Sequence, residues 1–325
     1  MHTDALKRSC AVLLIAAVVM ALFSFGVSAH PPNDGGYVVG NVNDYAYDGQ
    51  ITVTVLVESR PYSLTDSSSI YHYEDVTLGT SAGTNQISYV SDALYTVSAN
   101  AANNISMYTN EAATNPIAPN SSFVAAVKEG SKKYSSLWMM DGWCFRLNGK
   151  IPLIDWISGP PTGSPSGAAI NQTPLSDGDV IHFYYDNPNI MYDATYQPSF
   201  YAKVDFVYPE VNYNALTGNV LVKAKKNTHF FDASFNWTIN AFSSYLAGKN
   251  VYIYDSNASL VTQGTLNPSN GQVTLNTGTL SSGKYYVKVG SAGTQIVNGL
   301  NLYTFQMENF ELPKTTSGFN TFIVP

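Results

Sequence analysis

Hydrophobic and polar positions alternate with a period of two along most of the chain, which predicts strands. The clearest example is Ile51–Val57, which reads ITVTVLV and is rich in β-branched residues. Runs of this kind, bounded by Gly, Asn, Asp and Ser, are typical of strands. Further strands are expected at 123–127, 143–147, 180–185, 220–224, 235–239, 251–254, 260–266, 273–275, 285–289 and 300–305.

One segment carries a helical period instead. Its apolar residues recur at i, i+4, i+7 and i+11, at Val90, Leu94, Val97 and Ala101. This spacing places them on one face of a helix. Ser91 is the expected N-cap, because serine favours that position.

Turn signals separate the expected strands. Asn148-Gly149 predicts a hairpin turn, in which glycine supplies a positive φ. Asp177-Gly178-Asp179 predicts a tight turn that is closed by aspartate hydrogen bonds. After about residue 200 the strands are short and evenly spaced with no helical period, which favours a β-sandwich.

The first residues have the pattern of a cleavable signal peptide. Lys7 and Arg8 precede the apolar run 11–25, and Val27-Ser28-Ala29 offers a small-residue cleavage site. The apolar run is shorter than the roughly 20 residues that span a bilayer. We therefore expect an exported protein, secreted or at the cell surface, that is not inserted in a membrane after cleavage.

Charge and cysteine content narrow the function classes. The chain has a formal net charge of −7 and no cluster of Lys and Arg, so nucleic acid is not expected as a partner. Its two cysteines are Cys10, inside the signal segment, and Cys144, so the mature chain cannot form an internal disulfide.

Four features follow one another between residues 51 and 185: the strand Ile51–Val57, the helix opening Asp92-Ala93-Leu94, the block DGWCFRLNGK at 141–150 and the strand LSDGDVIHFYY at 175–185. In this order they resemble the transcobalamin C-terminal-like family (DUF4430). The resemblance implies a β-grasp-like fold, in which a sheet curls around one helix. For the motifs themselves, including Trp143, we expect structural roles in turns and core ahead of ligand contact.

The same resemblance implies a possible ligand. In the transcobalamins this domain covers one face of a corrinoid opposite a large helical domain, which this chain lacks. If this chain binds a ligand, the contacts are expected from the segment 151–173 and its surroundings. The candidate ligand-contacting residues are Trp138, Asp155, Trp156 and Tyr184. Packing of both tryptophans against the helix is an equally good interpretation.

A second pattern runs through residues 247–290, at Gly248, Val251, Tyr254, Asp255, Gly271, Leu280, Gly283, Tyr285 and Val287. It is similar to the prealbumin-like repeats of surface adhesins and carboxypeptidase-regulatory-like modules, although Asn257-Ala258 departs from their usual turn glycine. Such modules are generally spacers or adhesive units. The resemblance therefore implies a fold class and no catalysis.

The sequence carries no recognisable catalytic or metal-binding signature. The histidines of the mature chain lie in different segments and form no H-E-x-x-H pattern, and no G-x-S-x-G, Walker or Rossmann motif occurs. Asp177 and Asp179 share one turn, for which a structural role is favoured over a calcium site and a calcium site over catalysis. A copper site at His30 is a remote alternative. No cofactor is expected, with cobalamin the one candidate.

The segment 312–316, LPKTT, falls short of a sortase signal because Thr316 stands where glycine is required. We therefore expect no sorting signal, and release or non-covalent retention at the surface. Asparagines in N-x-S/T sequons matter only if the host glycosylates them; they are Asn104, Asn120, Asn171, Asn236 and Asn257.

The sequence thus predicts a mainly β protein with a signal peptide at 1–29 and an extended lead-in at 30–48. A β-grasp-like α+β domain at 49–200 precedes an Ig/prealbumin-like β-sandwich at 201–325. The leading function is a secreted, non-catalytic binding or adhesion protein, whose partner is an unknown small ligand or surface protein. A corrinoid carrier and a self-assembling surface protein remain as alternatives.

Overall fold

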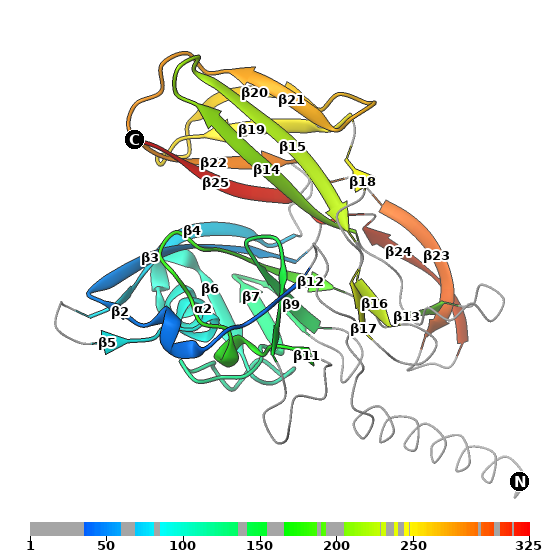
Figure 1. Ribbon diagram of the computed structural model, residues 1–325. Helices are drawn as coiled ribbons and strands as arrows, with labels where there is room; N and C mark the ends of the chain where they lie inside the picture. The colour runs from blue at the N-terminus through cyan, green and yellow to red at the C-terminus, as the bar shows by residue number, and fades with distance from the viewer. Residues whose placement is uncertain are drawn as a thin grey trace, which may run out of the picture.

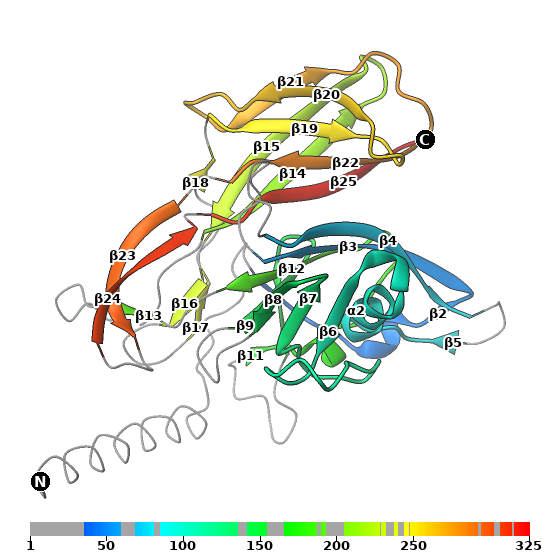
Figure 2. The same ribbon diagram turned by 180° about the vertical axis from the view of Figure 1, so that it is seen from behind.

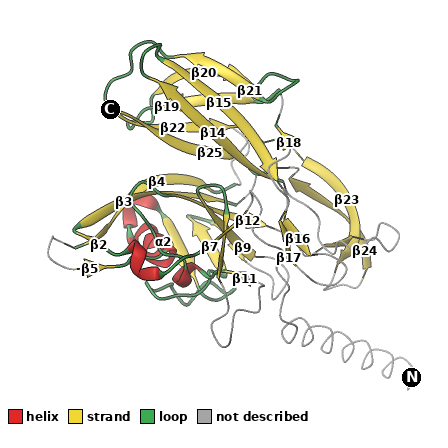
Figure 3. Cartoon of the chain, in the orientation of Figure 1, coloured by secondary structure: helices red, strands yellow, loops and turns green. Residues whose placement is uncertain are grey.

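A computed structural model describes residues 36–59, 69–80, 85–135, 142–154, 166–186, 190–192, 205–227, 229–231, 237–239, 244–246, 248–291, 294–301, 306–313 and 315–325. The signal segment 1–29 lies outside these residues. The described chain is mainly β, as expected, and α2 (Val90–Ala99) is the one α-helix within it (Figure 3).

The first domain is built on a four-stranded sheet in the order β4-β3-β12-β9. Its strands are β3 (Gln50–Glu58), β4 (Tyr71–Gly79), β9 (Gly142–Leu147) and β12 (Val180–Asp186). The first and last of these in sequence, β3 and β12, lie side by side and parallel, while the other neighbours are antiparallel. A sheet β6-β7-β8 adds to the domain, with strands Ile105–Tyr108, Ala126–Glu129 and Lys132–Ser135.

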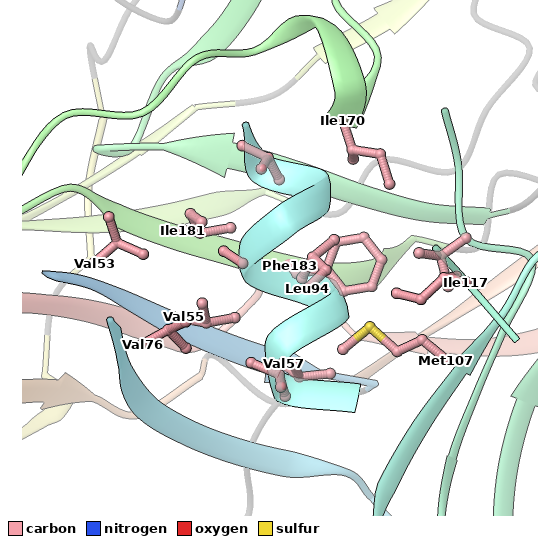
Figure 4. Close-up of a cluster of buried hydrophobic side chains, with 14 of the residues drawn as sticks. Val53, Val55, Val57, Val76, Leu94, Met107, Ile117, Ile170, Ile181 and Phe183 are labelled. Atoms are coloured by element: carbon pink, nitrogen blue, oxygen red, sulfur yellow. The ribbon is translucent and has the colours of Figure 1, made fainter. Parts of the chain in front are cut away.

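Helix α2 packs against one face of the four-stranded sheet (Figures 1 and 4). Val53, Val55 and Val57 alternate along β3 and are all buried beneath it, beside Leu94 of the helix. Residues two apart on a strand share a face, so one strand pattern supplies a whole row of the core. Trp143 packs on this core as expected, with its ring 5.0 Å from that of Phe183.

The helix start differs from the expectation at Ser91. Tyr89 is the N-cap residue, and its backbone N–H donates to Oδ2 of Asp92 at 2.7 Å. Ser91 lies inside the first turn and is buried. A carboxylate three residues after the cap satisfies a free N–H and favours the positive end of the helix dipole, so Asp92 replaces serine in the capping role.

The segment 30–48, expected as an extended lead-in, contributes elements to the first domain in its described part. Strand β1 (Gly36–Val38) pairs in parallel with β10 (Ile151–Ile154), which also pairs with β11 (Ser166–Gly167). The 3-10 helix η1 (Val42–Tyr45) follows, and β2 (Tyr47–Asp48) pairs with β5 (Asn85–Gln86). Short 3-10 helices η2 (Ala101–Asn103) and η3 (Ile170–Gln172) complete the domain.

The second domain is a β-sandwich. One sheet has the order β20-β19-β22-β25, with strands Leu260–Thr265, Asn250–Tyr254, Gly283–Val289 and Gly318–Val324. The other is β14-β15-β18 with β21 also on β15; these strands are Phe206–Asn214, Asn219–Asn227, Ser244–Tyr245 and Gln272–Asn276. Their facing side chains form one core that includes Val220, Val222, Val251, Ile253 and Val287.

Two smaller groups of strands lie beside the sandwich. Strand β13 (Ile190–Tyr192) pairs with β23 (Thr294–Asn301), which pairs with β24 (Gln306–Pro313). Strands β16 (His229–Phe231) and β17 (Trp237–Ile239) form a hairpin. Strand β13, which precedes the expected boundary at 200, is therefore joined by hydrogen bonds to a strand of the second half of the chain.

Figures 1 and 2 show β22 and β25 of the sandwich lying over β3 and β4 of the first domain. The face of the first sheet opposite α2 is thus covered by the second domain.

Candidate functional site

The four-stranded sheet has two different faces. Its α2 face carries the valines of β3, and the opposite face carries polar side chains. Thr54, Leu56 and Glu58 alternate with the buried valines of β3 and so point away from the helix. His182 of β12 lies beside Leu56, and Arg146 of β9 lies beside His182 in the strand register. All five side chains are buried. We call this surface, together with the second-domain residues that cover it, the inter-domain contact.

Glu58 is a buried carboxylate of the inter-domain contact that accepts hydrogen bonds from both domains. Its Oε2 lies 2.7 Å from Nε2 of His182 and accepts the hydroxyl of Ser317 at 2.8 Å. Its Oε1 accepts the backbone N–H of Ser317 at 3.0 Å. The carboxylate is 1% exposed. Buried charges are retained only where such partners compensate for lost hydration, so Glu58 ties the first domain to the start of β25.

A second polar group lies at Asp75 of β4. Its Oδ1 accepts the hydroxyl of Thr54 and the ammonium of Lys284, each at 2.8 Å, and its Oδ2 accepts the hydroxyl of Tyr286 at 2.9 Å. Burial, followed by the contact with Asp75, raises the pKa of Tyr286. Lys284 and Tyr286 lie on β22, so this carboxylate also joins the two domains.

Aromatic rings fill the space between these polar groups. The ring of Tyr73 lies 5.1 Å from that of Tyr286 and 5.4 Å from that of Phe319. Phe206 of β14 lies 5.0 Å from the His182 ring, and the Arg146 guanidinium carbon lies 4.2 Å above its centroid. Such ring pairs and cation–π contacts each contribute about 0.5–2 kcal/mol, so the contact is both polar and well packed.

The hairpin turn at Asn148-Gly149 belongs to the same contact. Both residues have positive φ, 51° and 78°, which confirms the expected turn. A Cβ on Gly149 would lie 2.4 Å from the ring of Tyr208 in β14. Glycine is therefore required here twice, for its backbone conformation and for the close approach of the second domain.

The ligand-contacting residues expected from sequence are mostly outside the described residues. This is the case for Trp138, Asp155 and Trp156. Tyr184 is described: it lies in β12 with 3% of its surface exposed, and its ring is 5.4 Å from that of Phe206. A ligand could reach Tyr184 only if the inter-domain contact opened.

The acidic turn at 177–179 is structural. Asp177 accepts the backbone N–H of Thr52 at 2.7 Å, and Asp179 accepts the N–H of Ser176 and the amide of Asn148. Burial raises the pKa of Asp179, which these hydrogen bonds partly oppose. Across the described ranges, no group of three or more His, Cys, Asp or Glu side chains could hold a metal ion.

Sequence reasoning did not assemble the inter-domain contact. The sequence did hint at a polar sheet face. Thr54 and Glu58 interrupt the apolar run of β3, and His182 and Tyr184 lie two apart in β12. The partners Lys284 and Ser317 lie more than 200 residues further along, and no spacing rule connects them.

Among the described residues, no helix has the length and apolarity needed to cross a membrane.

Comparison with known proteins gives one family match. Residues 232–300 match the model of the secretion system C-terminal sorting domain. No curated protein and no solved structure matches the chain at significant similarity. The matched stretch includes β19–β22, the region that resembles prealbumin-like modules. It corrects the expectation that no sorting signal is present, because sorting is read from a domain and not from the LPKTT peptide. The protein is therefore a secreted, cell-surface protein.

Proposed function

We propose that this protein is a non-catalytic binding or adhesion protein, presented at the cell surface by its second domain and binding its partner through the first. The observation that carries the proposal is the inter-domain contact. Glu58, His182, Arg146 and Asp75, the clustered ionisable groups of the first domain, are engaged beneath the second domain. They hold the two domains together and are covered, so the surfaces left for a partner are the outer loops.

The order of strands in the first domain supports a β-grasp-like fold. An N-terminal hairpin, β3–β4, is followed by α2, and the last strand β12 inserts in parallel beside β3. This arrangement, with one helix on one face, is consistent with the resemblance to the transcobalamin C-terminal-like family. It favours a small ligand or surface protein as partner.

A direct test uses the mature protein and its candidate aromatic contacts. Trp138→Ala and Trp156→Ala should each abolish capture of a partner that the wild-type protein binds, such as a glycan or matrix protein on an array. Phe123→Ala, which removes an exposed aromatic side chain of the described chain, is the control and should bind as wild type. Reproducible substrate turnover that is lost on mutating a defined cleft would overturn the non-catalytic assignment.

Corrinoid binding is the second candidate, favoured by the same strand order and motif set. Titration of the mature protein with cobalamin should then change the corrinoid absorption spectrum, and Trp156→Ala should weaken that change. No spectral or calorimetric change up to millimolar cobalamin would dismiss this function and leave the adhesion proposal intact.

A further inference from the structure

Three tyrosine rings surround the ammonium of Lys288 at the edge of the inter-domain contact. The Lys288 nitrogen lies 4.2 Å from the ring centroid of Tyr73, 4.6 Å from that of Tyr254 and 5.2 Å from that of Tyr71. All three distances are within the roughly 6 Å over which a cation is attracted to the face of an aromatic ring. We call these three side chains the tyrosine cage.

The tyrosine cage exists only when the two domains are docked. Tyr71 and Tyr73 are two residues apart on β4, so they point to the same side of the first sheet. Tyr254 lies on β19, where Tyr252 is registered opposite Lys288 and Tyr254 is the diagonal neighbour on the same face. Lys288 and the three tyrosines are each partly exposed, so the cage borders solvent.

Lysine is a poor occupant for such a place. Its ammonium is a compact, strongly hydrated charge, and burial lowers the pKa of Lys288 to about 8. A quaternary ammonium carries the same charge with weaker hydration and has no N–H proton to lose. Aromatic cages recognise such groups for this reason.

We propose that the tyrosine cage is a binding site for organic ammonium groups, filled in this structure by the chain's own Lys288. A ligand ammonium enters as Lys288 withdraws its side chain to solvent, and the cage then holds the ligand between the two domains. Because rings from both domains contact the cation, occupancy of the cage stabilises their docking. This site is separate from the outer loops proposed above, and its test is independent of theirs.

The experiment removes the Lys288 side chain from the tyrosine cage and adds a soluble ammonium compound in its place. Lys288→Ala removes the resident cation, and choline is the probe, with its uncharged isostere 3,3-dimethyl-1-butanol as the matched compound. At ten times its Kd, choline should raise the Tm of Lys288→Ala by about 2–5 °C. The uncharged isostere should leave the Tm of this variant unchanged.

Two control variants locate the effect. Lys249→Ala removes a lysine of the same domain outside the cage and should respond to choline no more than the wild type. The double variant Tyr73→Ala/Lys288→Ala removes the ring nearest the cation and should lose the response. Equal stabilisation by the uncharged isostere, or an undiminished response in the double variant, would overturn the proposal.

A measurement on the wild-type protein covers the case in which Lys288→Ala does not fold. Ring currents from the cage should move the ε-methylene proton resonance of Lys288 upfield of the other lysines. Saturating choline should return that resonance toward the others as Lys288 leaves the cage. A Lys288 resonance that coincides with the other lysines, or that choline does not move, contradicts the proposal.

Discussion

Replacing Glu58 by glutamine tests how strongly the two domains depend on one buried carboxylate. The substitution keeps the shape of the side chain and the Oε1 acceptor for the backbone N–H of Ser317. It replaces Oε2 with an NH2 group, which cannot accept hydrogen bonds from His182 and the Ser317 hydroxyl. The hydrogen bonds to Oε2 are therefore lost or reversed, while the one from the Ser317 backbone is kept.

The magnitude follows from these contacts. A hydrogen bond to a charged group contributes about 1.5–3 kcal/mol. Because one bond survives and the serine hydroxyl can rotate, we expect Glu58→Gln to lower the free energy of unfolding by about 2–4 kcal/mol. The control is Glu129→Gln, whose carboxylate is 23% exposed and contacts Lys132 at 2.7 Å. It should change the free energy of unfolding by less than about 1 kcal/mol.

Equilibrium urea denaturation followed by circular dichroism and tryptophan fluorescence measures both variants. In Glu58→Gln the unfolding curves from the two probes should no longer coincide. The reason is that the first domain, which contains Trp143, loses a contact with the second. If Glu58→Gln and Glu129→Gln both lie within about 0.5 kcal/mol of the wild type, the carboxylate does not hold the domains together.

Three further predictions concern the core, the contact and its pH dependence. Leu94→Ala empties a fully buried site beneath the sheet and should lower the free energy of unfolding by about 2–5 kcal/mol in urea. Gly149→Ala should lower the Tm more than Gly178→Ala. Both glycines have positive φ, but only a Cβ at Gly149 meets the ring of Tyr208. Equal losses of Tm would contradict the close approach of Tyr208 to Gly149. Because the folded pKa of Lys288 is lowered to about 8 from 10.5, the unfolded chain binds more protons between these values, and stability should rise as pH increases from 8 toward 10. Lys288→Met should remove that rise; above pH 10 the raised pKa values of buried tyrosines act in the opposite direction in both proteins.

Local features of the first domain could be predicted from sequence. The valines of β3, the span of α2 and the positive φ at Asn148-Gly149 each follow from a pattern within a dozen residues. Strand β4 was missed, since Tyr71–Gly79 reads YHYEDVTLG and only Val76 and Leu78 are buried in it. Tyr71, Tyr73 and Asp75 lie on the opposite face of the strand and contact the second domain, so this face carries polar and aromatic residues.

Strands β14 and β25 were also missed, for a related reason. Phe206–Asn214 reads FVYPEVNYN, and a proline within a run argues against a strand. Asn320 of β25 donates its side-chain amide to the backbone carbonyl of that Pro209 at 2.8 Å. A contact more than 100 residues away thus stabilises a segment whose own sequence favours a turn.

The sequence by itself predicted an exported protein, the mainly β class, the helix and the turns. These depend on hydrophobic period and backbone preference, which are properties of short segments. The tertiary structure alone decided that Glu58 and Asp75 meet Ser317 and Lys284, and that Tyr71 and Tyr73 enclose the ammonium of Lys288. These groups lie far apart in the chain and become partners only when the two domains dock. Docking also buries them, and a buried charge without a partner is costly.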